Sequence, residues 1–80
     1  MRIDKFLKNS RIIKRRTVAK DACDQGRITV NGKVAKPGTE VNEGDEIYIA
    51  FGNGSLNVEV VKILDTCRKE DAASMYRVIE

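Results

Sequence analysis

The first twenty residues of this chain carry a concentration of positive charge. Between positions 2 and 20, eight Lys and Arg side chains face a single acidic one, Asp4. Ammonium and guanidinium groups bind phosphate oxygens through charge-assisted hydrogen bonds, whereas ordinary protein surfaces mix both signs of charge. The cluster therefore predicts a surface for a polyanion. Its candidate contact residues are Arg2, Lys5, Lys8, Arg11, Lys14, Arg15, Arg16 and Lys20.

Three of these cations, at positions 14–16, directly precede a predicted helix. The amino end of a helix carries free N–H groups and a positive dipole, and both oppose nearby cations. The same N–H groups and the guanidinium forks can bind one phosphate together. The run therefore favours a phosphate site, and a solvated basic loop is the alternative interpretation.

The chain has 80 residues and a net charge of +3, but this charge is unevenly divided. Residues 1–36 carry eleven Lys and Arg against three Asp and Glu, a net +8, and residues 37–80 carry four against nine, a net −5. Self-repulsion of this kind destabilises a compact fold, so a nucleic-acid partner explains it best and an anionic membrane less well. We expect the acidic half to keep the opposite face off RNA and free for protein contact.

The composition excludes most catalysis. Histidine is absent, which removes the usual general base near neutral pH and any zinc site that needs imidazole. Cys23 and Cys67 lie 44 positions apart and form no CxxC pair, so we interpret both as reduced core thiols. The longest apolar run, residues 47–51, is far shorter than the roughly 20 residues of a membrane span. The sequence therefore predicts neither an enzyme nor a bound cofactor, metal or membrane.

Two acidic positions have structural interpretations. Asp4 has no second carboxylate nearby in the sequence, so we expect it to pair with a neighbouring cation and to orient that cation. Asp45 follows Gly44 before a predicted strand, and the spacing of the acids in residues 43–46 fits no calcium loop. We therefore interpret Asp45 as a structural residue of a turn.

Apolar periodicity predicts two short helices, over Ile3–Ser10 and Thr17–Gln25. Asp4 and the cations fall on the predicted outer face of the first helix, and Val18 falls on the inner face of the second, which ends at Gly26. Isolated helices of this length are marginal in water. Both must therefore pack against another layer.

That layer is predicted to be a small sheet. Alternating apolar residues indicate strands at 28–30 and 33–34, joined by an Asn31-Gly32 turn, and a third strand at 47–51. Residues 56–64 are also strand-like, and their phase slips between Val60 and Val61, which indicates a bulge or burial on both faces. We predict turns at 36–38 and 43–45, a helical turn over 68–74 and a closing strand over 75–79. The predicted fold class is α+β, with two short amino-terminal helices on a small, mostly antiparallel twisted sheet.

The aromatic residues do not form a base-stacking platform by their spacing. Phe6 and Phe51 are expected to pack in the core. For Tyr48 and Tyr76 the sequence leaves two roles open, packing in the core and stacking on bases.

An ordered series of motifs runs through residues 1–51. It begins with Arg2-Ile3-Asp4-Lys5-Phe6-Leu7 and continues with Arg11, Lys14-Arg15-Arg16-Thr17, Ala19, Gly26, Val30-Asn31-Gly32, Lys36-Pro37 and Gly44-Asp45. This series resembles the S4 RNA-binding domain. The resemblance implies an S4-like RNA-binding domain at residues 1–51, with residues 52–80 as a carboxy-terminal strand extension packed on the same sheet. It implies RNA held by the basic face of the helices, with Arg2 and Arg16 as principal contacts.

The full length of the chain also resembles small ribosome-associated members of this family that are related to heat-shock protein fifteen. The resemblance implies binding to a large ribosomal subunit obstructed by peptidyl-tRNA, contact with ribosomal RNA and tRNA, and support of alanine tailing beside an RqcH-type factor. It further implies a cytoplasmic protein that is a monomer off the ribosome. Phe6-Leu7 departs from the tryptophan of the heat-shock relative, so one shared binding pose is not implied. A module that uses its basic face to bind an acidic protein partner is the alternative.

Overall fold

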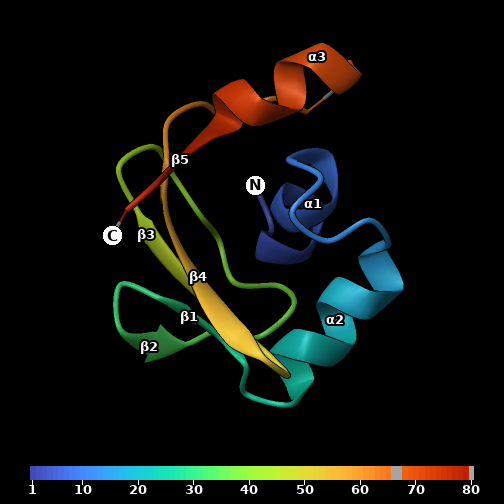
Figure 1. Ribbon diagram of the computed structural model, residues 1–80, viewed down its shortest axis with the longest axis vertical. Helices are drawn as coiled ribbons and strands as arrows, with labels where there is room; N and C mark the ends of the chain where they lie inside the picture. Colours follow the sequence, from blue (N-terminus) through green and yellow to red (C-terminus); the bar gives the residue numbers. More distant parts are fainter. Residues whose placement is uncertain (66–67, 80) are drawn as a thin grey trace.

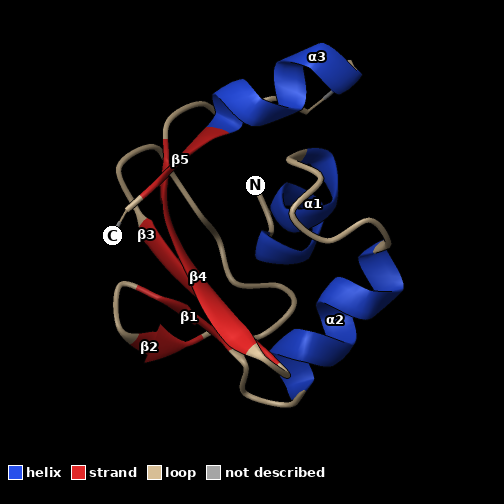
Figure 2. Ribbon diagram, viewed as in Figure 1, coloured by secondary structure: helices blue, strands red, loops and turns tan. Residues whose placement is uncertain are grey.

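The computed structural model describes residues 1–65 and 68–79, and in it two helices cover one side of an antiparallel sheet (Figures 1 and 2). The elements of these residues are α1 (Ile3–Asn9), α2 (Arg16–Asp24), β1 (Ile28–Val30), β2 (Lys33–Val34), β3 (Glu46–Phe51), β4 (Gly54–Val60), α3 (Lys69–Ala72), the 3-10 helix η1 (Ala73–Met75) and β5 (Tyr76–Val78). The predicted α+β class, with two short amino-terminal helices against a small sheet, is confirmed.

The sheet has the strand order β2-β1-β3-β4-β5, and all neighbouring strands in it are antiparallel. In β3 the buried Ile47 and Ile49 flank the exposed Tyr48, because successive residues of a strand point to opposite faces. Ile47 pairs with Val30 of β1 on one side and with Val58 of β4 on the other. One face of the sheet is therefore apolar, and the helices pack on it.

The predicted hairpin between β1 and β2 is confirmed. Val30 pairs with Lys33, which leaves Asn31 and Gly32 as a two-residue turn with φ angles of 52° and 84°. Positive φ at both positions is the geometry that Asn-Gly tolerates best. The Asn31 side-chain oxygen also accepts the Glu46 N–H at 2.9 Å, so the turn is attached to β3.

The core joins both helices to the sheet. Phe6 and Leu7 of α1 are fully buried, and Ala19 and Cys23 are the buried residues of α2. The small side chains on α2 let it lie close against α1, and the two helices contact each other. Docking on the sheet and on each other stabilises two helices that would be marginal alone.

Two of the residues predicted to face the core lie outside it. Val18 is 49% exposed and Phe51 is 43% exposed, so their predicted inward positions are wrong. The buried stripe of α2 is narrow and Val18 lies beside it, whereas Phe51 is the last residue of β3, at the end of the sheet. Phe6 is fully buried, as predicted.

The predicted strand over residues 56–64 is wrong beyond Val60, where β4 ends. The amides of Val61 and Lys62 both donate to the Met75 carbonyl oxygen, at 2.8 and 3.1 Å. The two amides share one acceptor in η1 just past the last pair of β4 and β5, so the predicted slip in phase coincides with the end of the strand. Val61 is 39% exposed, so the alternative of burial on both faces is wrong.

The carboxy-terminal elements follow the predicted order. The helical turn expected over 68–74 is present as α3 followed by η1, and the closing strand is β5, which pairs with β4. Cys23 is buried as predicted, while the interpretation of Cys67 falls outside the described residues. In the described part of the chain, every helix is too short or too polar to cross a membrane.

Leu7→Ala should lower the free energy of unfolding by about 2 to 5 kcal/mol, because it removes buried methyl groups and leaves a cavity between α1 and the sheet. Urea denaturation followed by circular dichroism measures the loss. Val18→Ala is the matched control and should stay within about 0.5 kcal/mol of the parent protein, because Val18 is exposed. Equal losses in the two variants would contradict this account of the core.

Candidate nucleic-acid interface

The eight predicted contact residues lie on α1, on α2 and on the segment that joins them. Arg2 directly precedes α1, Arg15 directly precedes α2, and Arg16 is the first residue of α2. Seven of the eight are exposed, and Lys5 is half-buried. The two helices are neighbours (Figure 1), so the eight predicted contacts lie on one helical pair and the segment that joins it.

Asp4 lies where the amino ends of the two helices meet. Its side chain is fully buried, with Oδ2 at 3.2 Å from Nη2 of Arg2 and at 3.3 Å from Nε of Arg16. The other oxygen, Oδ1, accepts the backbone N–H of Lys5 at 2.8 Å. The predicted pairing of Asp4 with a neighbouring cation is confirmed. Its predicted place on the outer face of the helix is wrong, because the two guanidinium groups let the carboxylate turn inward and stay compensated.

The two arginines keep binding capacity after pairing with Asp4. One carboxylate offsets only one of the two positive charges. Each guanidinium has five N–H donors, and the side chains of Arg2 and Arg16 remain 47% and 44% exposed. This pair, Arg2 with Arg16 on Asp4, is called the Asp4 clamp below. It can receive an anion with two side chains already ordered.

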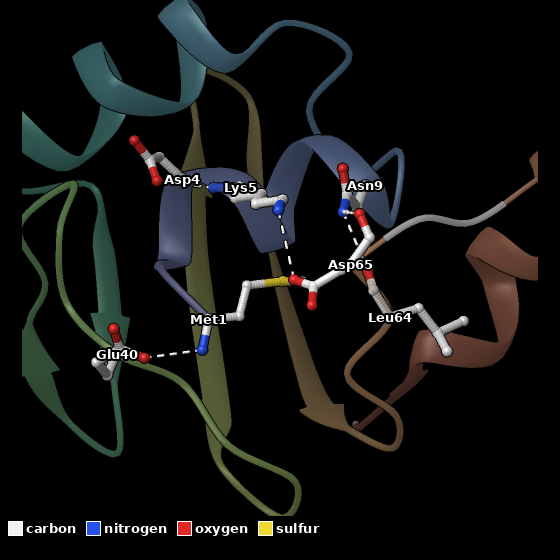
Figure 3. A network of polar contacts seen from close by, with 7 residues as sticks. All are labelled: Met1, Asp4, Lys5, Asn9, Glu40, Leu64 and Asp65. Carbon is white, nitrogen blue, oxygen red and sulfur yellow. Dashed lines mark hydrogen bonds and ion pairs between the residues drawn. The ribbon is translucent and has the colours of Figure 1, made fainter.

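The backbone around Arg2 is held by residues 37–40, which follow the start of the predicted turn at 36–38. The Ile3 N–H donates to the Thr39 carbonyl at 2.7 Å, and the Thr39 N–H donates to the Lys36 carbonyl at 3.0 Å, which confirms that turn. The amino group of Met1 lies 2.7 Å from a carboxylate oxygen of Glu40 (Figure 3). The sequence analysis missed Glu40, because its partner is 39 positions away and no local pattern signals the pair.

A second contact that the sequence analysis missed connects α1 to the segment after β4. The Lys5 ammonium lies 3.4 Å from an Asp65 carboxylate oxygen, and the Asn9 side-chain amide donates to the carbonyls of Leu64 and Asp65 at 3.1 and 3.0 Å (Figure 3). One acid of the acidic half therefore reaches the basic surface. The pair is exposed and weak, on the scale of about 0 to 1 kcal/mol, so Lys5 stays available to an anion.

Three further cations gather where α1 runs into the segment before α2. Lys8, Arg11 and Lys14 line a shallow pocket of about 240 Å³ together with Asn9. Within residues 1–65 and 68–79, no carboxylate lies in ion-pair distance of these three cations, of Arg15 or of Lys20. The structure thus brings five of the eight predicted residues together in two groups, the Asp4 clamp and this pocket. Arg15, just before α2, and Lys20 on α2 are exposed and join neither group, and Lys5 pairs with Asp65.

The turn interpretation of Asp45 is confirmed. Its carboxylate accepts the Asn42 N–H at 2.8 Å and the Asn31 side-chain amide at 3.2 Å, and Gly44 has a φ of 92°. The side chain fixes the turn before β3. Among the described residues, no three His, Cys, Asp or Glu side chains are grouped to hold a metal ion.

The thiol of Cys23 is shielded from reaction. Burial, together with the smaller effect of the negative charges of Asp4 and Asp24, raises its pKa to about 11. The group is therefore a neutral thiol at neutral pH and not a nucleophile.

Comparison with known proteins gives a consistent result. The model of the S4 domain family matches residues 1–47. Relatives named RQC P-site tRNA stabilizing factor are 60% identical over 78 residues in Halalkalibacterium halodurans and 56% identical over 79 residues in Streptococcus pneumoniae. These alignments cover 98% and 99% of this chain and 89% and 90% of the relatives. The trimeric structure of Vibrio cholerae Heat Shock Protein 15 superposes with a TM-score of 0.91 at 31% identity, over 99% of this chain and 81% of that one.

The raised pKa of Cys23 predicts a loss of stability in base. The folded pKa of about 11 lies above the ordinary value of 9.0, so the unfolded thiol ionises first as the pH rises. The contribution of Cys23 to the free energy of unfolding should be complete below pH 9 and should decline between pH 9 and 11. Urea denaturation of the parent protein and of Cys23→Ala over this range measures the contribution as their difference. A difference that does not change with pH would contradict the assigned shift.

Asp4→Asn should weaken RNA binding although it adds one net positive charge, because the arginines lose the carboxylate that orients them. It should also lower the free energy of unfolding by about 1 to 3 kcal/mol and bring the Cys23 pKa down. Affinity for a duplex RNA, measured by fluorescence anisotropy, tests the first effect. Asp65→Asn is the matched control, since it removes an exposed acid near the same surface and should leave binding unchanged or tighter. Equal affinities of the two variants would refute the orienting role.

Proposed function

Because the chain belongs to the S4 domain family, we propose that it is a non-enzymatic RNA-binding factor of ribosome quality control that acts on the large ribosomal subunit. The observation that carries this proposal is the basic surface on α1 and α2. The Asp4 clamp orders two arginines there, and five more cations have no carboxylate partner among the described residues. A surface of this kind binds a phosphate backbone.

The relatives' name, RQC P-site tRNA stabilizing factor, supports the finer form of the proposal. The substrate particle is a large subunit still obstructed by peptidyl-tRNA, and the protein contacts both ribosomal RNA and tRNA on it. Holding the tRNA in place supports alanine tailing carried out with an RqcH-type factor. Residues 1–51 are the RNA-binding domain, and residues 52–80 extend the same sheet.

Binding depends on phosphate contacts. Arg2 and Arg16 are the principal contacts, since the Asp4 clamp fixes their geometry before RNA arrives. The remaining contacts are Lys5, Lys8, Arg11, Lys14, Arg15 and Lys20. The deep major groove of duplex RNA cannot be read by side chains, so the shape of the RNA determines specificity more than base edges do.

Each cation that neutralises a phosphate releases counterions, so log affinity should fall linearly with log salt concentration. Arg16→Ala should reduce the magnitude of this slope by about 1. Binding to purified large subunits, measured by co-sedimentation over a salt series, gives the slope. Lys62→Ala removes the same charge from an exposed residue beyond β4 and should leave the slope unchanged.

Two outcomes would count against the proposal. Binding that does not respond to salt would contradict the phosphate mechanism. Capture of a protein partner that survives ribonuclease treatment, without binding to large subunits, would favour the alternative in which the basic face binds an acidic protein.

A further inference from the structure

We propose that the pocket lined by Lys8, Asn9, Arg11 and Lys14 is a second phosphate site, which binds a backbone phosphate of RNA separately from the Asp4 clamp. The proposal rests on the RNA-binding function given above and adds a defined site to it. This site is called the junction pocket, because it lies where α1 passes into the segment before α2. It has a volume of about 240 Å³.

The cations of the junction pocket have no acidic partner within residues 1–65 and 68–79. Lys8 lies in the last turn of α1, Arg11 follows its final cap, and Lys14 precedes α2. None of the four lining residues is acidic, and no carboxylate of the described residues pairs with the three cations. The carboxyl end of a helix carries only about half a negative charge. It can stabilise one cation there but not three.

The backbone of Arg11 provides an independent observation. Its φ is 62°, in the left-handed region that L-residues other than Asn and Asp rarely occupy. The other described non-glycine residue with positive φ is Asn31, and Gly26 takes this conformation after α2. At those two positions the chain has residue types that tolerate positive φ, whereas position 11 is an arginine. The Arg11 side chain is thus present despite its backbone strain, next to a pocket whose cations have no acidic partner among the described residues. This combination indicates that the Arg11 side chain takes part in binding.

The wall of the pocket is fixed by hydrogen bonds. The Asn9 side-chain amide donates to the carbonyls of Leu64 and Asp65, which holds the end of α1 to the segment after β4 (Figure 3). The Ile13 N–H donates to the Leu7 carbonyl at 3.1 Å and closes the turn around Arg11. The three cations therefore extend from a backbone that is already ordered.

Lys8 and Arg11 of the junction pocket lie at the carboxyl end of α1, whereas Arg2 and Asp4 lie at its amino end, and Lys14 belongs to the segment that returns to Arg16. This helix has seven residues, which is about 10 Å at 1.5 Å per residue. A single phosphate group cannot reach both ends. The two sites would therefore hold different phosphates and fix the direction of the RNA strand along α1.

The variant Arg11→Gly separates the conformational strain at position 11 from the contribution of the arginine side chain to binding. Glycine relieves the left-handed conformation, so the midpoint of thermal unfolding should rise or stay unchanged, while affinity for a duplex RNA falls several-fold and the salt slope decreases by about 1. Arg11→Lys keeps the charge and should retain the slope. Lys62→Ala is the control for loss of a cation elsewhere. Parental affinity and slope in Arg11→Gly would overturn the site, and a reduced slope in Arg16→Ala in the same series would show that the RNA-binding function still stands.

Titration of the full chain with inorganic phosphate, followed by backbone amide NMR, gives a second measurement. Saturable shifts should be centred on residues 8–14, should be lost in Lys8→Gln/Lys14→Gln, and should be reversed by added duplex RNA. Shifts confined to Arg2 and Arg16 would overturn the junction pocket. Phosphate that the RNA fails to displace would overturn its assignment to an RNA backbone.

Discussion

The burial of the Asp4 carboxylate is the constraint on which the arrangement of the basic surface depends. A charged group without water needs several partners, and here these are two guanidinium groups and the Lys5 N–H. Among the described residues, no buried side-chain nitrogen or oxygen lacks a hydrogen-bond partner. Because Arg2 precedes α1 and Arg16 begins α2, satisfying this one carboxylate also sets how the two helices approach each other.

The sheet holds this surface without contributing to it directly. Ile47 and its cross-strand neighbours form the apolar face under α1, and the turn at residues 36–38 attaches the chain before α1 to the strand layer. Attachment at both the helix faces and the amino end leaves Arg2 little backbone freedom. The Arg2 side chain is therefore ordered during folding, and RNA binding does not have to supply the free energy of ordering it. Preorganised sites gain affinity in this way.

Local sequence patterns predicted most of the fold, because apolar periodicity and turn-forming residues act over only a few positions. The Asn31-Gly32 hairpin, the alternation in β3 and the Gly26 helix stop all follow from such patterns. The errors share a different cause. A periodicity argument puts every acid outside, so it misplaced Asp4, whose burial depends on an arginine twelve positions away. The contact of Lys5 with Asp65 is between residues sixty positions apart, and no local signal could reveal it.

The cations on α1 and α2 act in two physically different ways. The Asp4 clamp has half of its charge offset by a carboxylate, so it contributes less to the long-range field and more to fixed geometry. The cations without a carboxylate partner among the described residues, such as Lys8 and Lys14, contribute a field that attracts a polyanion before contact and that salt screens. A surface made only of the second kind would bind RNA quickly but without a preferred orientation. Combining both kinds on neighbouring helices allows fast capture by one group and alignment by the other.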